Sequence, residues 1–145
     1  MIGRRDVEGL VLKTSRSFAV NKDRLDWSQE WSHSRQPHLY ILAGIYVRHM
    51  VVLSARGRRQ DLPAAFQLIE DMLLEGDDYV RELAIHGFLE GFQTSDRPDD
   101  FVPYLLPVSK WWWEELELFW DSKVESLGSS GRPKPAEIEP PVTSV

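Results

Sequence analysis

The chain has 145 residues, a length typical of a single domain that can bury its own hydrophobic core. It contains no cysteine, which excludes a disulfide scaffold, thiolate metal sites and a cysteine nucleophile, and agrees with a reducing cytoplasm. The formal net charge is −6, but residues 1–60 carry eleven Lys or Arg against five Asp or Glu, whereas residues 61–145 carry six against eighteen. This asymmetry indicates a charged partner, unless the two halves interleave in the fold and their fields cancel.

No segment of the sequence predicts export or membrane insertion. The first residues are charged where a signal peptide requires an apolar core, so we expect no cleaved leader. The longest apolar run, residues 39–47, is shorter than the roughly 20 residues that span a bilayer. We therefore expect a cytoplasmic protein without membrane contact, in which this run is part of a buried helix.

Hydrophobic periodicity predicts an all-α fold. Apolar residues recur at spacings of three and four, and no useful length alternates with a period of two. A first helix is predicted near residues 4–18. The polar segment that follows, residues 21–37, is predicted to be irregular and to be pinned to the core by Trp27 and Trp31, which lie one turn apart.

A second helix is predicted over residues 38–55. It is apolar nearly all round at its start and is therefore expected to be central. Gly57 is expected to stop this helix, and Asp61 is expected to cap the next one, which begins near Pro63.

The third and fourth helices, residues 63–75 and 78–93, are predicted to form an antiparallel hairpin. Gly76 is expected to adopt the left-handed conformation that closes a helix, and Asp77 to cap the fourth helix. The summed length of about thirty residues resembles one unit of the helical-repeat proteins, so we expect about five helices in a HEAT-like or bundle arrangement. The side chains expected to point outward include Gln67, Glu70, Asp71, Glu75, Glu82, His86 and Glu90.

The last helix is predicted over residues 108–127. Trp112, Trp113 and Trp120 share its apolar face and are expected in the core, whereas Trp111 lies about 100° round the helix and is expected to be exposed or to anchor a partner. The helical domain then spans residues 1–127. The Pro/Gly/Ser-rich tail, residues 128–145, is expected to be extended or disordered unless another surface holds it.

The sequence contains no recognisable catalytic set. The four histidines, His33, His38, His49 and His86, lie in no metal-protease pattern. Glu82, His86 and Glu90 follow one another at i, i+4 and i+8, which would contribute metal ligands only if a second helix supplied the rest; we find no such set and favour a solvated face. No glycine-rich phosphate loop follows a strand. We therefore expect no enzymatic activity, no cofactor and no metal.

The run Arg56-Gly-Arg-Arg59 leaves a role in nucleic-acid binding open. Basic clusters supply the non-specific part of such binding, but cations are also favoured at the carbonyl end of a helix. Because the cluster is small and the chain is acidic overall, we do not expect nucleic acid to be the partner.

A dense set of carboxylates surrounds the predicted hairpin turn. A rigid acidic surface would steer a basic partner and select it by charge, although acidic faces also serve solubility. The residues that we expect to bind a partner are Glu75, Asp77, Asp78, Glu82 and Glu90, with Trp111 as a further anchor.

Three stretches carry a family resemblance: Pro37-His-Leu-Tyr-Ile-Leu-Ala-Gly44, Phe66-Gln-Leu-Ile-Glu-Asp-Met-Leu-Leu-Glu-Gly-Asp-Asp-Tyr-Val-Arg-Glu-Leu83 and Gly87-Phe-Leu-Glu-Gly-Phe92. They resemble a family of small helical bacterial proteins often regarded as immunity proteins of polymorphic toxin systems. The resemblance covers residues 37–93. It implies a cytoplasmic antitoxin that binds a cognate toxin domain, expected to be basic, and blocks its active site or its access to substrate. A nucleic-acid-associated adaptor or another helical interaction module is the alternative, and the oligomeric state stays open.

Overall fold

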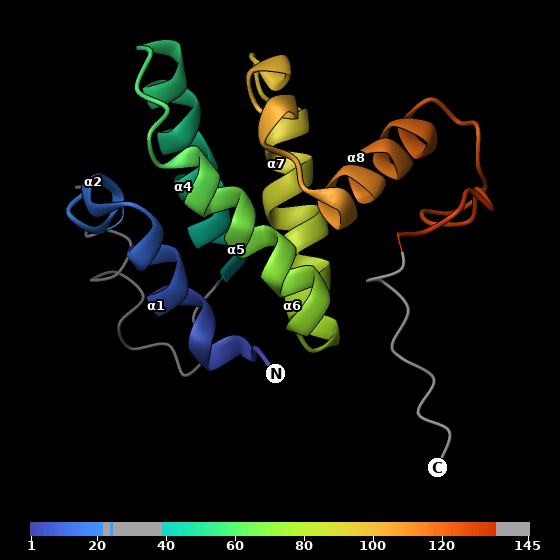
Figure 1. Ribbon diagram of the computed structural model, residues 1–145, viewed down its shortest axis with the longest axis horizontal. Helices are drawn as coiled ribbons and strands as arrows, with labels where there is room; N and C mark the ends of the chain where they lie inside the picture. The colour runs from blue at the N-terminus through green and yellow to red at the C-terminus, as the bar shows by residue number, and fades with distance from the viewer. Residues whose placement is uncertain (22–23, 25–38, 136–145) are drawn as a thin grey trace.

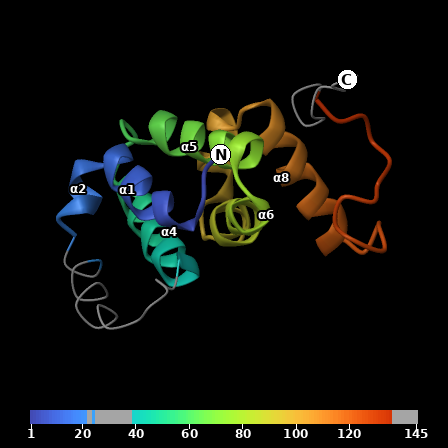
Figure 2. The same ribbon diagram turned by 90° about the horizontal axis from the view of Figure 1, so that it is seen from below.

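The computed structural model describes residues 1–21, 24 and 39–135 (Figures 1 and 2). These residues form an all-α domain without a strand, which confirms the predicted fold class. Trp27, Trp31, His33 and His38 lie outside the described residues. The elements in chain order are α1 (Arg4–Thr14), α2 (Arg16–Ala19), α4 (Leu39–Ala55), α5 (Leu62–Glu75), α6 (Asp78–Glu82), the π-helix η1 (Leu83–Leu89), α7 (Glu90–Gln93), the 3-10 helices η2 (Pro98–Asp100) and η3 (Val102–Tyr104), and α8 (Pro107–Trp120).

The first predicted helix is interrupted at Ser15. This residue is extended, with φ −152°, and its hydroxyl accepts a hydrogen bond from the backbone N–H of Phe18, which caps α2. The same hydroxyl donates to Asp61 Oδ2 at 2.7 Å. The prediction that Asp61 caps α5 is wrong, because its side chain makes no capping bond and holds Ser15 instead.

The centre of the core is η1, which packs against α4, α5 and α8. Residues predicted to face inward on this helix, including Val80, Leu83, Phe88 and Phe92, are buried. The second predicted helix, α4, is less central than expected because Tyr40, among others, remains exposed on one side. Burial of so many apolar side chains supplies the main favourable free energy of folding. The aromatic part of the core includes Phe66, Phe92 and Phe101, with ring centroids 4.5 to 6.3 Å apart.

The hairpin turn between α5 and α6 is closed by the N-terminus of the chain. The N–H of Ile2 donates to the carbonyl of Glu75 at 2.8 Å, and the N–H of Asp77 donates to the carbonyl of Ile2 at 3.0 Å. Figure 1 shows the N-terminus beside this turn. Asp77 caps α6 as predicted, because its Oδ1 accepts from the N–H of Val80 at 2.9 Å.

Gly76 does not adopt the predicted left-handed conformation, since its φ is −76° and its ψ is 154°. Glycine is needed for a different reason: a Cβ at this position would overlap the carbonyl oxygen of Met72 and would lie 2.6 Å from Cγ1 of Val80. Close packing of the turn therefore excludes a side chain. Gly57, in contrast, has the positive φ of 75° expected of a glycine that ends a helix.

Glu70 joins α5 to the start of α8. It was expected to point outward, but its side chain is only 5% exposed. Its two carboxylate oxygens accept hydrogen bonds from the N–H groups of Val108 at 2.9 Å and Ser109 at 2.7 Å. A carboxylate is favoured at this position because the first N–H groups of a helix lack intrahelical partners and carry partial positive charge. Glu70 is thus a cap supplied by another helix.

The last helix ends at Trp120 rather than near residue 127. The N–H of Ser122, which has a positive φ of 58°, donates to the carbonyl of Phe119, and the N–H of Lys123 donates to Leu118. This pair of bonds closes a helix by a Schellman motif. Both views show α8 at the opposite end of the molecule from α1 and α2 (Figures 1 and 2). Among the described helices, none is long and apolar enough to cross a membrane.

Candidate functional site

The predicted acidic residues lie at the turn and along the outer side of the hairpin, a surface that we call the acidic edge and define as Glu75, Asp77, Asp78, Glu82 and Glu90. Glu75, Asp78 and Glu82 are exposed, whereas Asp77 and Glu90 are half-buried. Asp77 is occupied as the cap of α6, and Glu90 accepts from His86 Nδ1 at 3.0 Å. The exposed members are therefore the ones available to a partner.

The basic N-terminal helix lies next to this acidic edge. The guanidinium of Arg4 stacks over the ring of Tyr79, 3.9 Å from its centroid, and α1 packs against both α5 and α6. The positive and negative halves of the chain thus interleave here, which was the alternative to a strongly dipolar molecule. Among the described residues, however, no Lys, Arg or His approaches the carboxylates of Glu75, Asp78 or Glu82 within 4.0 Å.

The arginine loop after α4 is partly committed to the fold. Arg59 Nη2 lies 3.5 Å from Asp100 Oδ2, and its Nε donates to Ser54 Oγ at 3.0 Å. Arg97 donates to the same Asp100 oxygen at 2.6 Å. The hydrogen bond from Arg97 is the main cause of the lowered pKa of Asp100, with smaller contributions from Ser54 and Arg59. One arginine of the loop therefore holds the segment after α7 in place.

A polar network that was not predicted connects α2 to α4. Ser17 Oγ lies 2.9 Å from His49 Nε2, and Asn21 Nδ2 lies 2.9 Å from His49 Nδ1. The serine, histidine and asparagine resemble a nucleophile, a base and an orienting amide, but the hydrogen bonds run the other way. Asn21 Oδ1 accepts from the N–H of Arg24, so its Nδ2 donates to Nδ1. His49 therefore carries its proton on Nε2 and donates to Ser17.

This network continues from Ser17 to Ser15, 3.1 Å away, and from Ser15 to Asp61. With its proton on Nε2, His49 cannot remove the proton of Ser17, so the geometry is that of a structural connection between α2, α4 and the start of α5. Burial lowers the pKa of His49, and the charge of Asp61 opposes this shift only in part. No sequence pattern indicates the network, because its residues come from separate elements without a recognisable spacing.

The metal constellation considered for Glu82, His86 and Glu90 is not assembled. Only His86 and Glu90 make contact, and no group of three or more His, Asp or Glu within the described ranges has the geometry to hold an ion.

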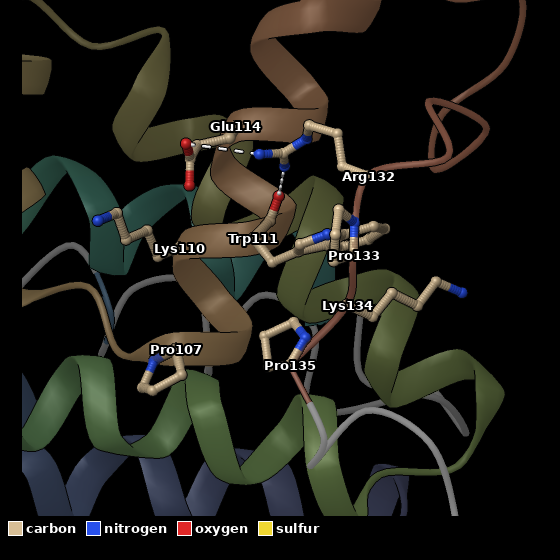
Figure 3. Close-up of a pocket in the computed structure, with 8 residues that line it drawn as sticks. All are labelled: Pro107, Lys110, Trp111, Glu114, Arg132, Pro133, Lys134 and Pro135. Atoms are coloured by element: carbon tan, nitrogen blue, oxygen red, sulfur yellow. Dashed lines mark hydrogen bonds and ion pairs between the residues drawn. The ribbon is translucent and has the colours of Figure 1, made fainter.

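A second group of buried polar contacts lies on α8, where the chain folds back after the helix. We call the space between α8 and residues 132–135 the α8 groove; it has a volume of about 370 Å³ (Figure 3). Trp111, which was expected to be exposed, is only 5% exposed because this returning segment covers it. Trp120, which was expected in the core, is 56% exposed. Trp113 is buried and Trp112 is partly buried, in agreement with the prediction.

Glu115, which no sequence pattern singled out, lies on α8 beside the α8 groove and accepts hydrogen bonds from the returning segment. Its side chain is fully buried, with 0% exposure. Ser130 Oγ lies 2.6 Å from both carboxylate oxygens, and Arg132 Nε donates to Oε2 at 2.8 Å. Burial raises the pKa of the Glu115 carboxyl, but the hydrogen bonds from Ser130 and Arg132 and the charge of Arg132 outweigh it, so the pKa lies below its ordinary value. Glu115 is therefore an ionised, buried carboxylate.

The guanidinium of Arg132 makes further contacts on α8. Its Nη2 donates to the carbonyl of Trp111 at 3.1 Å, and its Nη1 lies 3.5 Å from Glu114 Oε2. Arg132 and Lys134 place their cations 5.7 and 5.5 Å from the centroid of the Trp111 ring. Figure 3 shows the indole extending from α8 toward Pro133. Its Nε1–H is buried and has no acceptor among the described residues.

The fold and these surfaces define a single all-α domain with an acidic helical hairpin and a closing helix that holds an extended basic segment. The chain belongs to the family described as Domain of unknown function (DUF7674), which matches residues 19–121 and so includes the hairpin and α8 but not residues 128–135. No curated protein and no solved structure matches the chain at a significant level. The comparison thus identifies the family without assigning an activity.

Proposed function

We propose that this protein acts by binding a basic protein through the acidic edge, and that its role is that of an immunity protein which neutralises a bacterial toxin domain. The observation that carries the proposal is the exposure of Glu75, Asp78 and Glu82, whose carboxylates have no cationic partner among the described residues. A cluster of exposed negative charges raises the rate of encounter with a basic partner and disfavours binding of acidic competitors.

The framework behind the acidic edge supports binding without a large conformational change. Glu82 directly precedes the buried helix η1, and Asp77 and Asp78 are held by the cap of α6 and by the backbone bonds to Ile2. A backbone held in this way needs little rearrangement when a partner arrives, which favours affinity. We further propose that the hairpin acts as a HEAT-like unit, which contacts the partner with its turn.

The assignment to toxin neutralisation rests on the resemblance of residues 37–93 to immunity proteins. Neutralisation requires a tight complex, for which an interface of about 1,600 Å² in total is the ordinary expectation. The acidic edge would form one part of that interface. The competing role as a nucleic-acid adaptor is less supported, because Arg59 is already paired with Asp100.

The test is an affinity capture from the source cells with the full chain, followed by mass spectrometry of the retained proteins. The variant Glu75→Lys/Glu82→Lys inverts two exposed charges of the acidic edge, and Glu117→Lys/Glu125→Lys makes the same change of charge at exposed positions elsewhere. We expect one basic protein to be retained by the wild type and by the control variant, and to be lost from the edge variant.

Neutralisation is then tested by expressing the captured protein alone and together with each variant. We expect it to arrest growth, and we expect the wild type and the control variant, but not the edge variant, to restore growth. Equal retention by all three chains would contradict the role of the acidic edge. Retention of nucleic acid alone, removable by salt, would favour the adaptor instead.

A further inference from the structure

Beside the α8 groove, helix α8 carries a buried carboxylate, that of Glu115, whose partners come from a separate segment of the chain. Both oxygens of Glu115 are satisfied by Ser130 and Arg132, which lie outside the part of the chain that matches the family. A buried carboxylate is costly unless a cation and hydrogen-bond donors compensate it. Helix α8 therefore requires a basic segment at this position.

The contacts select arginine over lysine. One guanidinium donates from Nε to Glu115 and from Nη2 to the carbonyl of Trp111, and its Nη1 also approaches Glu114. Arginine has five donors in a planar fork, whereas the single ammonium of lysine cannot reach these acceptors in the same geometry.

The prolines after Arg132 make apolar contacts in the groove. Pro133 and Pro135 line the groove together with Trp111 and with Pro107 at the start of α8. Proline-rich segments dock against aromatic side chains at low entropic cost, because their extended conformation is preformed. The sequence that the groove accommodates is therefore Arg-Pro-x-Pro, here with Lys134 as the third residue.

The segment of residues 130–135, which now occupies the groove, leaves one hydrogen-bond donor unpaired within the described part of the chain and part of the volume unfilled. The Trp111 Nε1–H is buried without an acceptor among the residues that the structure describes, and about 370 Å³ remains between α8 and the segment. The connection from α8 to Ser130 is largely exposed, including Asp121, Ser122 and Lys123. A ligand that offered a carbonyl to Trp111 would recover a hydrogen bond which the present segment does not make.

We propose that the α8 groove is a binding site for an arginine-proline segment of another protein, and that residues 130–135 occupy it as an internal ligand which the partner displaces. The site is separate from the acidic edge, since it is formed by α8 and its own carboxylate. A failure of one proposal therefore leaves the other intact.

The test measures binding of a fluorescent peptide that copies residues 128–135, by anisotropy, to the full chain. The variant Ser130→Ala/Arg132→Ala removes both internal partners of Glu115, and Lys123→Ala is a control in the exposed connection. A short tether holds an internal ligand at an effective concentration on the order of 1 mM, which suppresses binding to the wild type. We expect the double variant to bind the peptide at least ~10-fold more tightly than the wild type or the control.

Two further comparisons distinguish specific recognition of arginine from non-specific attraction of any positive charge. We expect a peptide with Lys in place of its Arg to bind the double variant about 10-fold more weakly, as loss of a charge-assisted bond predicts. We also expect Glu115→Gln, added to the double variant, to weaken binding of the arginine peptide to a similar extent. Circular dichroism of each variant establishes that the helices are intact.

The proposal is overturned if the double variant binds the peptide no more tightly than the wild type does, or if the peptides with Arg and with Lys bind the double variant equally. Loss of helical structure in the double variant would also overturn it, because the segment would then be an integral part of the domain. Sedimentation of the wild type as a dimer that Glu115→Gln dissociates would assign the site to the tail of a second copy instead.

Discussion

Glu70→Ala is expected to lower the free energy of unfolding by about 3 kcal/mol, because Glu70 caps α8 from another helix. The carboxylate receives the N–H groups of Val108 and Ser109, and its side chain is 5% exposed, so water cannot replace it without a rearrangement. Truncation leaves two buried donors unpaired at the positive end of a helix.

The magnitude follows from these two bonds. A hydrogen bond to a charged group contributes about 1.5–3 kcal/mol, and an unpaired buried donor costs about 1–3 kcal/mol. These figures describe the same loss, and partial solvation of the helix end reduces their sum, which gives a range of about 2–4 kcal/mol. Glu70→Gln keeps one acceptor and is expected to cost about half as much. For a chain near this size, the alanine variant should lower the Tm by about 6–12 °C.

Urea denaturation followed by circular dichroism at the helix band measures the difference. Glu75→Ala is the matched control, because Glu75 lies on the same helix but is exposed, and its replacement should stay within about 0.5 kcal/mol of the wild type. If Glu70→Ala and Glu75→Ala were equally stable, the inter-helix cap would not contribute as argued.

Three further predictions concern the hairpin turn, His49 and the tryptophans. Gly76→Ala should cost about 1–3 kcal/mol in thermal melts, because its Cβ meets Met72 and Val80, whereas Gly9→Ala, which meets nothing within 4 Å, should not destabilise the fold. Burial holds the pKa of His49 below its ordinary 6.5, so the unfolded chain binds more protons as the pH falls below that value. The free energy of unfolding should therefore decrease from pH 6.5 toward the folded pKa, and His49→Gln should abolish this part of the pH dependence. In acrylamide quenching, Trp120→Phe should remove more accessible fluorescence than Trp111→Phe, and the opposite order would contradict the placement of these residues.

The all-α class, the span of α4 and the inward face of the hairpin were all predictable from the sequence. These features depend on local periodicity: apolar residues at helical spacing must share a face, and that face is buried in any compact arrangement. The cap at Asp77 was predictable for the same reason, since an N-cap needs only an acceptor just before the helix and N–H groups two or three residues later.

The tertiary structure alone decided which polar and aromatic side chains are covered. Glu70 was expected to be exposed because a helical wheel records angular position but not the neighbour, and here the neighbour is the N-terminus of α8. Gly76 was expected to supply a left-handed turn, but the close approach of Met72 and Val80 requires it instead. Glu70 contacts residues that are distant in sequence, and the contacts of Gly76 depend on the path of the chain through the turn. A local sequence pattern therefore predicts neither.

The α8 groove is the clearest case of this difference. Residues 111–120 were assigned to buried and exposed faces by spacing, and the order was inverted for Trp111 and Trp120. A Schellman motif ends the helix at Trp120, and the following segment returns to cover Trp111 and Glu115. Amphipathic spacing determines that a helix has two faces, but the path of the chain beyond the helix determines which of them water reaches, because burial is a property of the packed neighbours and not of the helix alone.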